Sequence, residues 1–159
     1  MTREEFEHAL VTKAPHLQAV ADPIWTAAGT LPDADGIPFP LVLAAVCDRE
    51  SRGGLALRPD GNGSDGHGCG IFQFDDRYWS DFCISGDAND PTKASKAAAE
   101  LLVANFKVLK SWRPAIAAYN CGRSAARRAL AAGEDPDVHT TGGDYSSWVL
   151  RRATALSKK

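Results

Sequence analysis

A single glutamate, Glu50, carries the clearest chemical signal in the sequence. It follows an apolar run that starts at Leu41, and Ser51-Arg52-Gly53-Gly54 comes directly after it. Burial disfavours the charged form of a carboxyl group, so a glutamate on an apolar helix is poised to stay protonated near neutral pH. A protonated carboxylic acid facing a groove is the general acid that cleavage of a glycosidic bond requires. The alternative is a solvated glutamate at a helix end, the usual environment of this residue type.

Three further blocks follow in the chain. Residues 68–75 are Gly-Cys-Gly-Ile-Phe-Gln-Phe-Asp, residues 116–122 are Ile-Ala-Ala-Tyr-Asn-Cys-Gly, and residues 137–145 are Asp-Val-His-Thr-Thr-Gly-Gly-Asp-Tyr. Each block alone is weak, but together with Glu50 they keep one order over roughly residues 38–155. In this order they resemble the lysozyme-like superfamily shared by goose-type lysozymes and soluble lytic transglycosylases. The last block is similar to the C-terminal signature of the goose type.

The resemblance implies a muramidase that cleaves the β-1,4 bond between N-acetylmuramic acid and N-acetylglucosamine in peptidoglycan. Glu50 would be the general acid, and no cofactor is implied. One alternative is a lytic transglycosylase, which forms 1,6-anhydro-muropeptides. Another is a non-catalytic glycan-binding or phage-structural module that keeps the fold. The Asp-x-x-Thr-Thr pattern at Asp137 and the aspartates near the glycine-rich stretch favour hydrolysis.

The second carboxylate of such a site is harder to locate. An inverting glycosidase needs a base about 6.5–9.5 Å from the acid, with room for a water between them. The resemblance implies aspartates that position this water. Asp75 matches one of them, and Asp65 is the counterpart of the other, although a gapless alignment places Ser64 there. Asp76 is expected to point away from its neighbour. For each aspartate, the alternative is a turn residue that bonds to the backbone.

The resemblance also implies four residues that contact the glycan. Tyr119 is expected near Glu50, where it would orient the carboxyl group or contact a sugar; the alternative is a core aromatic with a polar tip. Tyr145 matches a second active-site tyrosine. The predicted substrate-binding residues are Gln73, Tyr119, Asn120 and Tyr145.

Other chemistries find no support in the sequence. The four histidines have no metal-binding spacing, and no His-Glu-x-x-His occurs. Ser51 lacks the Gly-x-Ser-x-Gly elbow of a serine hydrolase. The glycine-rich stretch leads into a predicted strand and not into a helix, which argues against nucleotide binding. We therefore expect no metal and no nucleotide cofactor.

The elements that would position these residues are mostly helical. Glycine is a poor helix former, so the five glycines between Gly61 and Gly70 exclude a helix there. The resemblance implies a small sheet in this region, with Ile71–Phe74 as strand or strand end. Asp144 is a candidate cap of the last helix. The expected class is α+β, predominantly α-helical: a lysozyme-like fold with a small β-sheet lining the active-site groove. Helices are predicted from Thr2, from Pro15 through Trp25, over 38–50, from Pro91 to Leu109, over 115–120, over 124–132 and over 145–156, with a loop over 29–37.

Length and charge set the remaining limits. The 159 residues fit one catalytic domain, 1–159, with its motifs in about 38–155. The net charge is −2, but residues 1–95 hold 7 Lys/Arg against 15 Asp/Glu, whereas residues 96–159 hold 11 against 5. The two halves could simply attract each other, or a basic surface could lie beside an acidic cleft that suits cell-wall glycan with its peptides. The basic residues lack interleaved aromatics, so nucleic acid is a poor partner. A monomer is expected.

No stretch is long and apolar enough to cross a membrane. The residues from Met1 to Glu5 are charged and lack an apolar segment behind them, so no signal peptide is expected in this chain. The resemblance implies action on the bacterial cell wall. The enzyme would be secreted, released by another route such as holin-assisted release of a phage endolysin, or carried as a module of a larger protein.

The four cysteines have no Cys-x-x-Cys spacing, and three full disulfide pairings stay open. Cys47 and Cys121 are expected to be buried free thiols that pack as small hydrophobes. Cys69 and Cys83 are the candidate disulfide pair, because the chain between them can turn back on itself.

Overall fold

Helix α3 (Phe39–Ser51) runs through the middle of the fold and carries Glu50 in its last turn. Eleven of its thirteen residues are buried, and a helix that is apolar on all sides belongs in a protein core. Pro40 lies in its first turn, where the missing N–H costs nothing. The helix ends at Arg52, which adopts the left-handed conformation with φ 53°.

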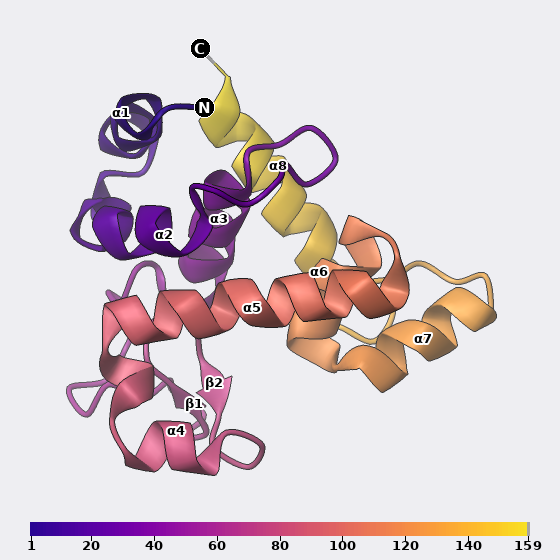
Figure 1. Ribbon diagram of the computed structural model, residues 1–159. Coiled ribbons are helices and arrows are strands. Elements are labelled where there is room, and N and C mark those ends of the chain that lie inside the picture. Colours follow the sequence, from indigo (N-terminus) through magenta and orange to yellow (C-terminus); the bar gives the residue numbers. More distant parts are fainter. Residues whose placement is uncertain (159) are drawn as a thin grey trace.

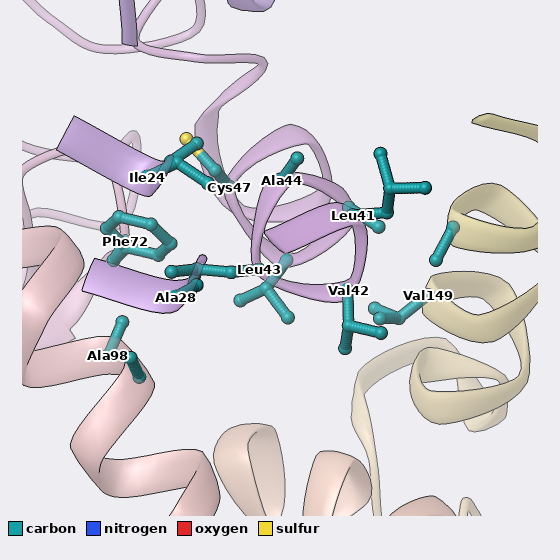
Figure 2. Packing of buried hydrophobic residues seen from close by; sticks show 14 of the residues in the cluster. Ile24, Ala28, Leu41, Val42, Leu43, Ala44, Cys47, Phe72, Ala98 and Val149 are labelled. Atoms are coloured by element: carbon teal, nitrogen blue, oxygen red, sulfur yellow. The ribbon is translucent and has the colours of Figure 1, made fainter. Parts of the chain in front are cut away.

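In this computed structural model, which describes residues 1–158, α3 is enclosed by other helices. It packs against α2 and α8, while α5 packs against α2 and α6. Figure 2 shows Leu43 of α3 on the side of Ala28 and Phe72, whereas Val42 faces Val149 of α8. The remaining helices are α1 (Arg3–Lys13), α2 (Ala21–Ala28), α4 (Ser80–Ile84), α5 (Pro91–Leu109), α6 (Trp112–Cys121), α7 (Arg123–Ala131) and α8 (Tyr145–Ser157), with 3₁₀ turns η1 (Pro15–Val20), η2 (Asp87–Asn89) and η3 (Thr141–Gly143).

Helix α5 divides the molecule, as Figure 1 shows. Helices α1, α2, α3 and α8 lie on one side of it in this view, and the sheet, α4 and α7 lie on the other. The sheet has two antiparallel strands, β1 (Gly68–Cys69) and β2 (Phe74–Asp75), with Gly68 opposite Asp75. The predicted α+β class, predominantly helical with one small sheet, is confirmed. No helix within residues 1–158 combines the length and the apolar character that crossing a bilayer requires.

The predicted helix positions mostly agree with the structure, with local exceptions. The expected strand over Ile71–Phe74 is wrong for all but its last residue. Residues 70–73 form a turn, closed by the bond from the Gln73 N–H to the Gly70 carbonyl (3.1 Å), with Gln73 at φ 52°. The helix predicted from Pro15 is a 3₁₀ turn followed by α2. Helix α6 begins at Trp112 and not at residue 115, because Pro114 fits within its first turn.

A buried ion-pair cluster ties both ends of the chain to α3. Asp48, two residues before Glu50, is buried, with only 9% of its surface exposed. Its Oδ1 lies 2.7 Å from Nε2 of His16 in η1, and its Oδ2 accepts a bond from Nε of Arg152 in α8 (2.8 Å). A buried carboxylate without partners would be costly. The cluster therefore fixes η1 and α8 against the half of α3 that ends at Glu50.

The cysteines divide as the sequence suggested. Cys69 and Cys83 form a disulfide with a Cα–Cα distance of 5.9 Å, while Cys47 and Cys121 are free. Cys47 is buried as expected, but Cys121 is only partly buried, because it ends α6 at the surface. The disulfide joins β1 to α4 and so closes the hairpin that carries Asp75.

Replacing both bonded cysteines, Cys69→Ala with Cys83→Ala, is expected to lower the free energy of unfolding by about 3 kcal/mol, because a loop of this length loses that much closure entropy when cross-linked. The measurement is denaturant unfolding, with Cys121→Ala as the control. Thiol titration in denaturant should give two reactive thiols without reductant and four with it. Four thiols without reductant would contradict the pairing.

Candidate active site

Glu50 lies where α3 reaches a large open groove. The pKa of Glu50 is raised to about 7, chiefly by burial and to a smaller extent by the nearby Asp65 charge. The hydrogen bond from the Tyr145 hydroxyl to Glu50 Oε1 and the charge of Arg49 act in the opposite direction on this pKa. Desolvation is the largest of these effects. The carboxyl group is thus protonated over a wide range below neutral pH.

Tyr145 is the first residue of α8, and it is held there by Asp137. The Asp137 side chain is 1% exposed and accepts bonds from the backbone N–H groups of Ser146 (2.7 Å) and Ser147 (3.0 Å). A carboxylate that accepts the first N–H groups of a helix stabilises that helix end. The Thr140 hydroxyl donates to the Asp137 carbonyl oxygen (2.9 Å). The sequence block 137–145 is therefore a cap that positions Tyr145 against Glu50.

Asp144, the candidate cap of this helix, occupies the N-cap position, but its side chain makes no cap bond. Its Oδ1 instead accepts a bond from Nη2 of Arg49 (2.7 Å). The Arg49 guanidinium also lies over the rings of Trp148, at 5.2 Å, and Tyr145, at 5.9 Å. No sequence pattern marked Arg49; the available signal was its place beside Glu50, in the run of three charged residues that follows the apolar part of α3.

Tyr119 occupies the same neighbourhood but uses its hydroxyl elsewhere. The hydroxyl donates to the Phe72 carbonyl oxygen (2.9 Å), which joins α6 to the turn before β2. Burial raises the pKa of Tyr119 well above its usual value, and the nearby Glu50 charge adds to that rise. The hydroxyl that contacts Glu50 is therefore that of Tyr145, and the orienting contact expected from Tyr119 does not form.

The two candidate aspartates differ in how their oxygens are used. Asp65 Oδ1 accepts the backbone N–H groups of His67 (3.0 Å) and Gly68 (3.2 Å), and these bonds lower the Asp65 pKa. Its Oδ2 has no hydrogen-bond partner within residues 1–158. Asp75 has both oxygens engaged by the Arg77 guanidinium, at 2.8 and 2.6 Å, which lowers the Asp75 pKa.

Asp76, adjacent to Asp75, turns aside as expected and approaches Nδ1 of His67 (3.0 Å). The charge of Asp65 acts on Glu50 and raises the Glu50 pKa. Asp65 thus combines a charge close enough to affect Glu50 with an oxygen still able to accept a bond.

The predicted amide residues stabilise the walls of the groove. Gln73 Nε2 donates to the Gly70 carbonyl oxygen (2.9 Å), and its Oε1 lies where a Cβ on Gly63 or Gly68 would sit. Only glycine fits at those two positions while Gln73 keeps this rotamer. Asn120 Oδ1 accepts the backbone N–H of Thr141 (2.8 Å), which ties the end of α6 to η3.

The groove encloses about 1080 Å³ and brings every predicted site residue together. This volume is close to the upper end of the range of small-molecule pockets, about 300–1,000 Å³. Within residues 1–158, no three His, Cys, Asp or Glu side chains are arranged to hold a metal ion. The predicted residues that line the groove are Glu50, Asp65, Gln73, Asp75, Tyr119, Asn120 and Tyr145.

Comparison with known proteins gives consistent matches. A family model described as Lysozyme g matches residues 36–159, which include every predicted site residue. The lysozyme g of Cyprinus carpio is 36% identical over 130 residues, covering 76% of this chain and 65% of the relative. That of Casuarius casuarius is 30% identical over 120 residues, covering 72% and 62%. The chain therefore spans less than two thirds of the length of these relatives.

The raised Glu50 pKa predicts a pH-dependent gain of stability in Glu50→Gln. The unfolded carboxyl group releases its proton near pH 4.5 and the folded one near 7, so the folded state binds more protons between these values and loses stability as pH rises through them. The glutamine variant escapes this loss. The free energy of unfolding of Glu50→Gln should equal that of the parent at pH 4 and exceed it by about 2–3 kcal/mol at pH 8.

The measurement is chemical denaturation at both pH values. Glu100→Gln, an exposed position on α5, is the control and should change stability by less than about 0.5 kcal/mol at either pH. A Glu50→Gln effect that is the same at pH 4 and pH 8 would refute the raised pKa.

Proposed function

This chain belongs to the lysozyme g family, and from that premise we propose that it is a peptidoglycan hydrolase of the bacterial cell wall. As a muramidase it cleaves the β-1,4 bond between N-acetylmuramic acid and N-acetylglucosamine. One observation carries the proposal: a partly buried carboxyl group with a pKa of about 7, hydrogen-bonded to a buried tyrosine, at the wall of an open groove of about 1080 Å³.

Glu50 is the proposed general acid. Its proton passes to the glycosidic oxygen as the bond from that oxygen to the sugar C1 breaks, and the leaving sugar departs as an alcohol. The sugar ring carries positive charge in this transition state. The Glu50 carboxylate that remains is stabilised by the Tyr145 hydroxyl and by the nearby Arg49 charge, both of which favour its ionised form.

Asp65 is the proposed base that positions the attacking water. Its pKa is lowered, so it is ionised when Glu50 is protonated, and the two carboxyl groups hold opposite protonation states over several pH units. Its free Oδ2 can accept a proton of the water that adds to the sugar C1. In this scheme Asp75 has a supporting role, because the Arg77 guanidinium occupies both of its oxygens.

The remaining groove residues have proposed roles in binding the glycan. The Asn120 side-chain NH₂ group is free to donate to a sugar hydroxyl or acetamido group, because only its Oδ1 is used within the described chain. Tyr119 presents its ring to the groove while its hydroxyl holds the Phe72 turn. Gln73 shapes the groove wall on the side of the glycine-rich turn, through its contacts with that turn.

The products distinguish hydrolysis from its alternatives. With purified peptidoglycan, mass spectrometry should find soluble muropeptides with reducing ends, and Glu50→Gln should release them about 10²–10⁴-fold more slowly. Anhydro-muropeptides, lighter by one water, would instead show a transglycosylase, in which the muramyl 6-hydroxyl attacks. If the parent chain released no product, the remaining interpretation would be a non-catalytic binding or structural module.

The two aspartates should separate in the same assay. Asp65→Asn is expected to lower kcat for glycan cleavage by about 10²-fold, because the amide cannot accept the proton of the water. Asp75→Asn should lower it less than about tenfold, since that oxygen pair only anchors Arg77. Circular dichroism controls for folding. A larger loss in Asp75→Asn than in Asp65→Asn would reverse the assignment.

A further inference from the structure

One long segment of the chain contains no acidic residue. Residues 101–133, which cover the second half of α5, all of α6 and all of α7, hold neither Asp nor Glu. This is unexpected in a protein whose net charge is −2. The basic residues of the segment are Lys107, Lys110, Arg113, Arg123, Arg127 and Arg128.

Five of these six side chains have no ion-pair partner. Arg113 pairs with Asp135 at 2.7 Å and lies 3.6 Å from Asp137. None of the other five forms an ion pair with any residue in 1–158, and all five residues are exposed. Lys107 lies on the other side of α5 from the groove, in a pocket that α5 shares with α2. We call the other four the basic surface: Lys110, Arg123, Arg127 and Arg128.

Helix packing does not explain these charges. Helix α7 lies against α6 and α5 through Ala125, Ala126 and Ala129, all buried, and its arginines point outward. Arg123 and Arg127 are four residues apart on one face, a spacing at which like charges destabilise a helix. The arrangement therefore costs stability and has no compensating partner within the described chain.

The basic surface continues into the catalytic groove. Arg123 and Ser124 line the groove, as does Cys121. Burial raises the pKa of Cys121, and the charge of Arg128 acts against that rise, which places Arg128 near the groove wall.

The opposite side of the groove is acidic. Residues 60–90 hold seven aspartates and one arginine. Figure 1 shows the β1–β2 hairpin and α7 at opposite ends of the region beside α5. On the hairpin side the groove is lined by Asp65 and by the Asp75–Arg77 ion pair, whereas Arg123 of the basic surface lines it on the α7 side.

We propose that the basic surface binds the carboxylates of the peptide stems that the glycan strand carries, and so fixes which way round the strand enters the groove. The inference rests on the proposed function. Peptide stems project from the muramic acid residues of the same strand, so a surface continuous with the groove meets them without a second binding event. Carboxylates placed on the hairpin side would face the aspartates instead, and like charges suppress that orientation.

Phosphate groups of other wall polymers offer similar charge but are not attached to the sugar being cleaved. The continuity through Arg123 therefore favours the peptide stems. Contacts between exposed charges are individually weak and are screened by salt. The arginines and the lysine of the basic surface together should give a measurable, salt-dependent contribution to binding.

The test variant is Lys110→Gln/Arg127→Gln/Arg128→Gln, which leaves the groove residue Arg123 unchanged. The control, Arg3→Gln/Lys93→Gln/Lys96→Gln, removes the same charge from α1 and from the other end of α5. Both are made on the Glu50→Gln chain, so that bound glycan is not cleaved. Retention is measured by co-sedimentation with peptidoglycan, with and without its phosphate polymers, before and after an amidase removes the peptide stems.

The test variant is expected to bind intact peptidoglycan about three- to thirtyfold more weakly than the control at low salt, with the difference vanishing near 1 M salt. Both should bind the stripped glycan equally. Equal weakening on stripped and intact glycan, equal weakening in the control, or a loss seen only when phosphate polymers are present would each overturn the proposal. Because binding is measured without cleavage, an absence of products from the parent chain would count against the proposed function alone.

Discussion

The structure depends on holding one carboxyl group out of water at the edge of a water-filled groove. Desolvation raises the Glu50 pKa to about 7 only because α3 is buried on almost every side. A helix at the surface would carry the same residue as an ordinary solvated anion. The core residues around α3 therefore contribute to the chemistry of the site as well as to stability.

Carboxylates gather around the last turns of the same helix. Asp48, which is buried, bonds to His16 and Arg152, while the partly exposed Asp144 anchors Arg49. Asp137, also buried, caps α8 and so holds Tyr145 in contact with Glu50. The two buried carboxylates, Asp48 and Asp137, would be costly if they lost their partners. The contacts leave α3 and α8 little freedom to slide past each other, which gives Glu50 a fixed position.

The sequence predicted most of the fold because periodicity and glycine content are local signals. The helix that ends near Glu50 and the long helix from Pro91 lie where their patterns placed them. The turn before Phe74 was mistaken for a strand, because its apolar residues are buried without being extended. The sequence predicted which residues line the groove, but it did not predict which hydrogen bonds each of them makes. Whether Tyr119 or Tyr145 reaches Glu50, and which aspartate keeps a free oxygen, depends on bonds between distant segments that no local pattern records.

The partners of Glu50, and those of its neighbours Asp48 and Arg49, come from far along the chain. Tyr145 bonds to Glu50 and Asp144 to Arg49 across 95 residues, and Arg152 reaches Asp48 across 104. Closing so long a loop carries a large entropic cost, and non-local contacts of this kind form slowly. The environment of Glu50 is therefore completed late in folding: a partly folded chain can hold its α3 helix and its glycine-rich turn and still lack the hydroxyl that bonds to Glu50, because α8 supplies it.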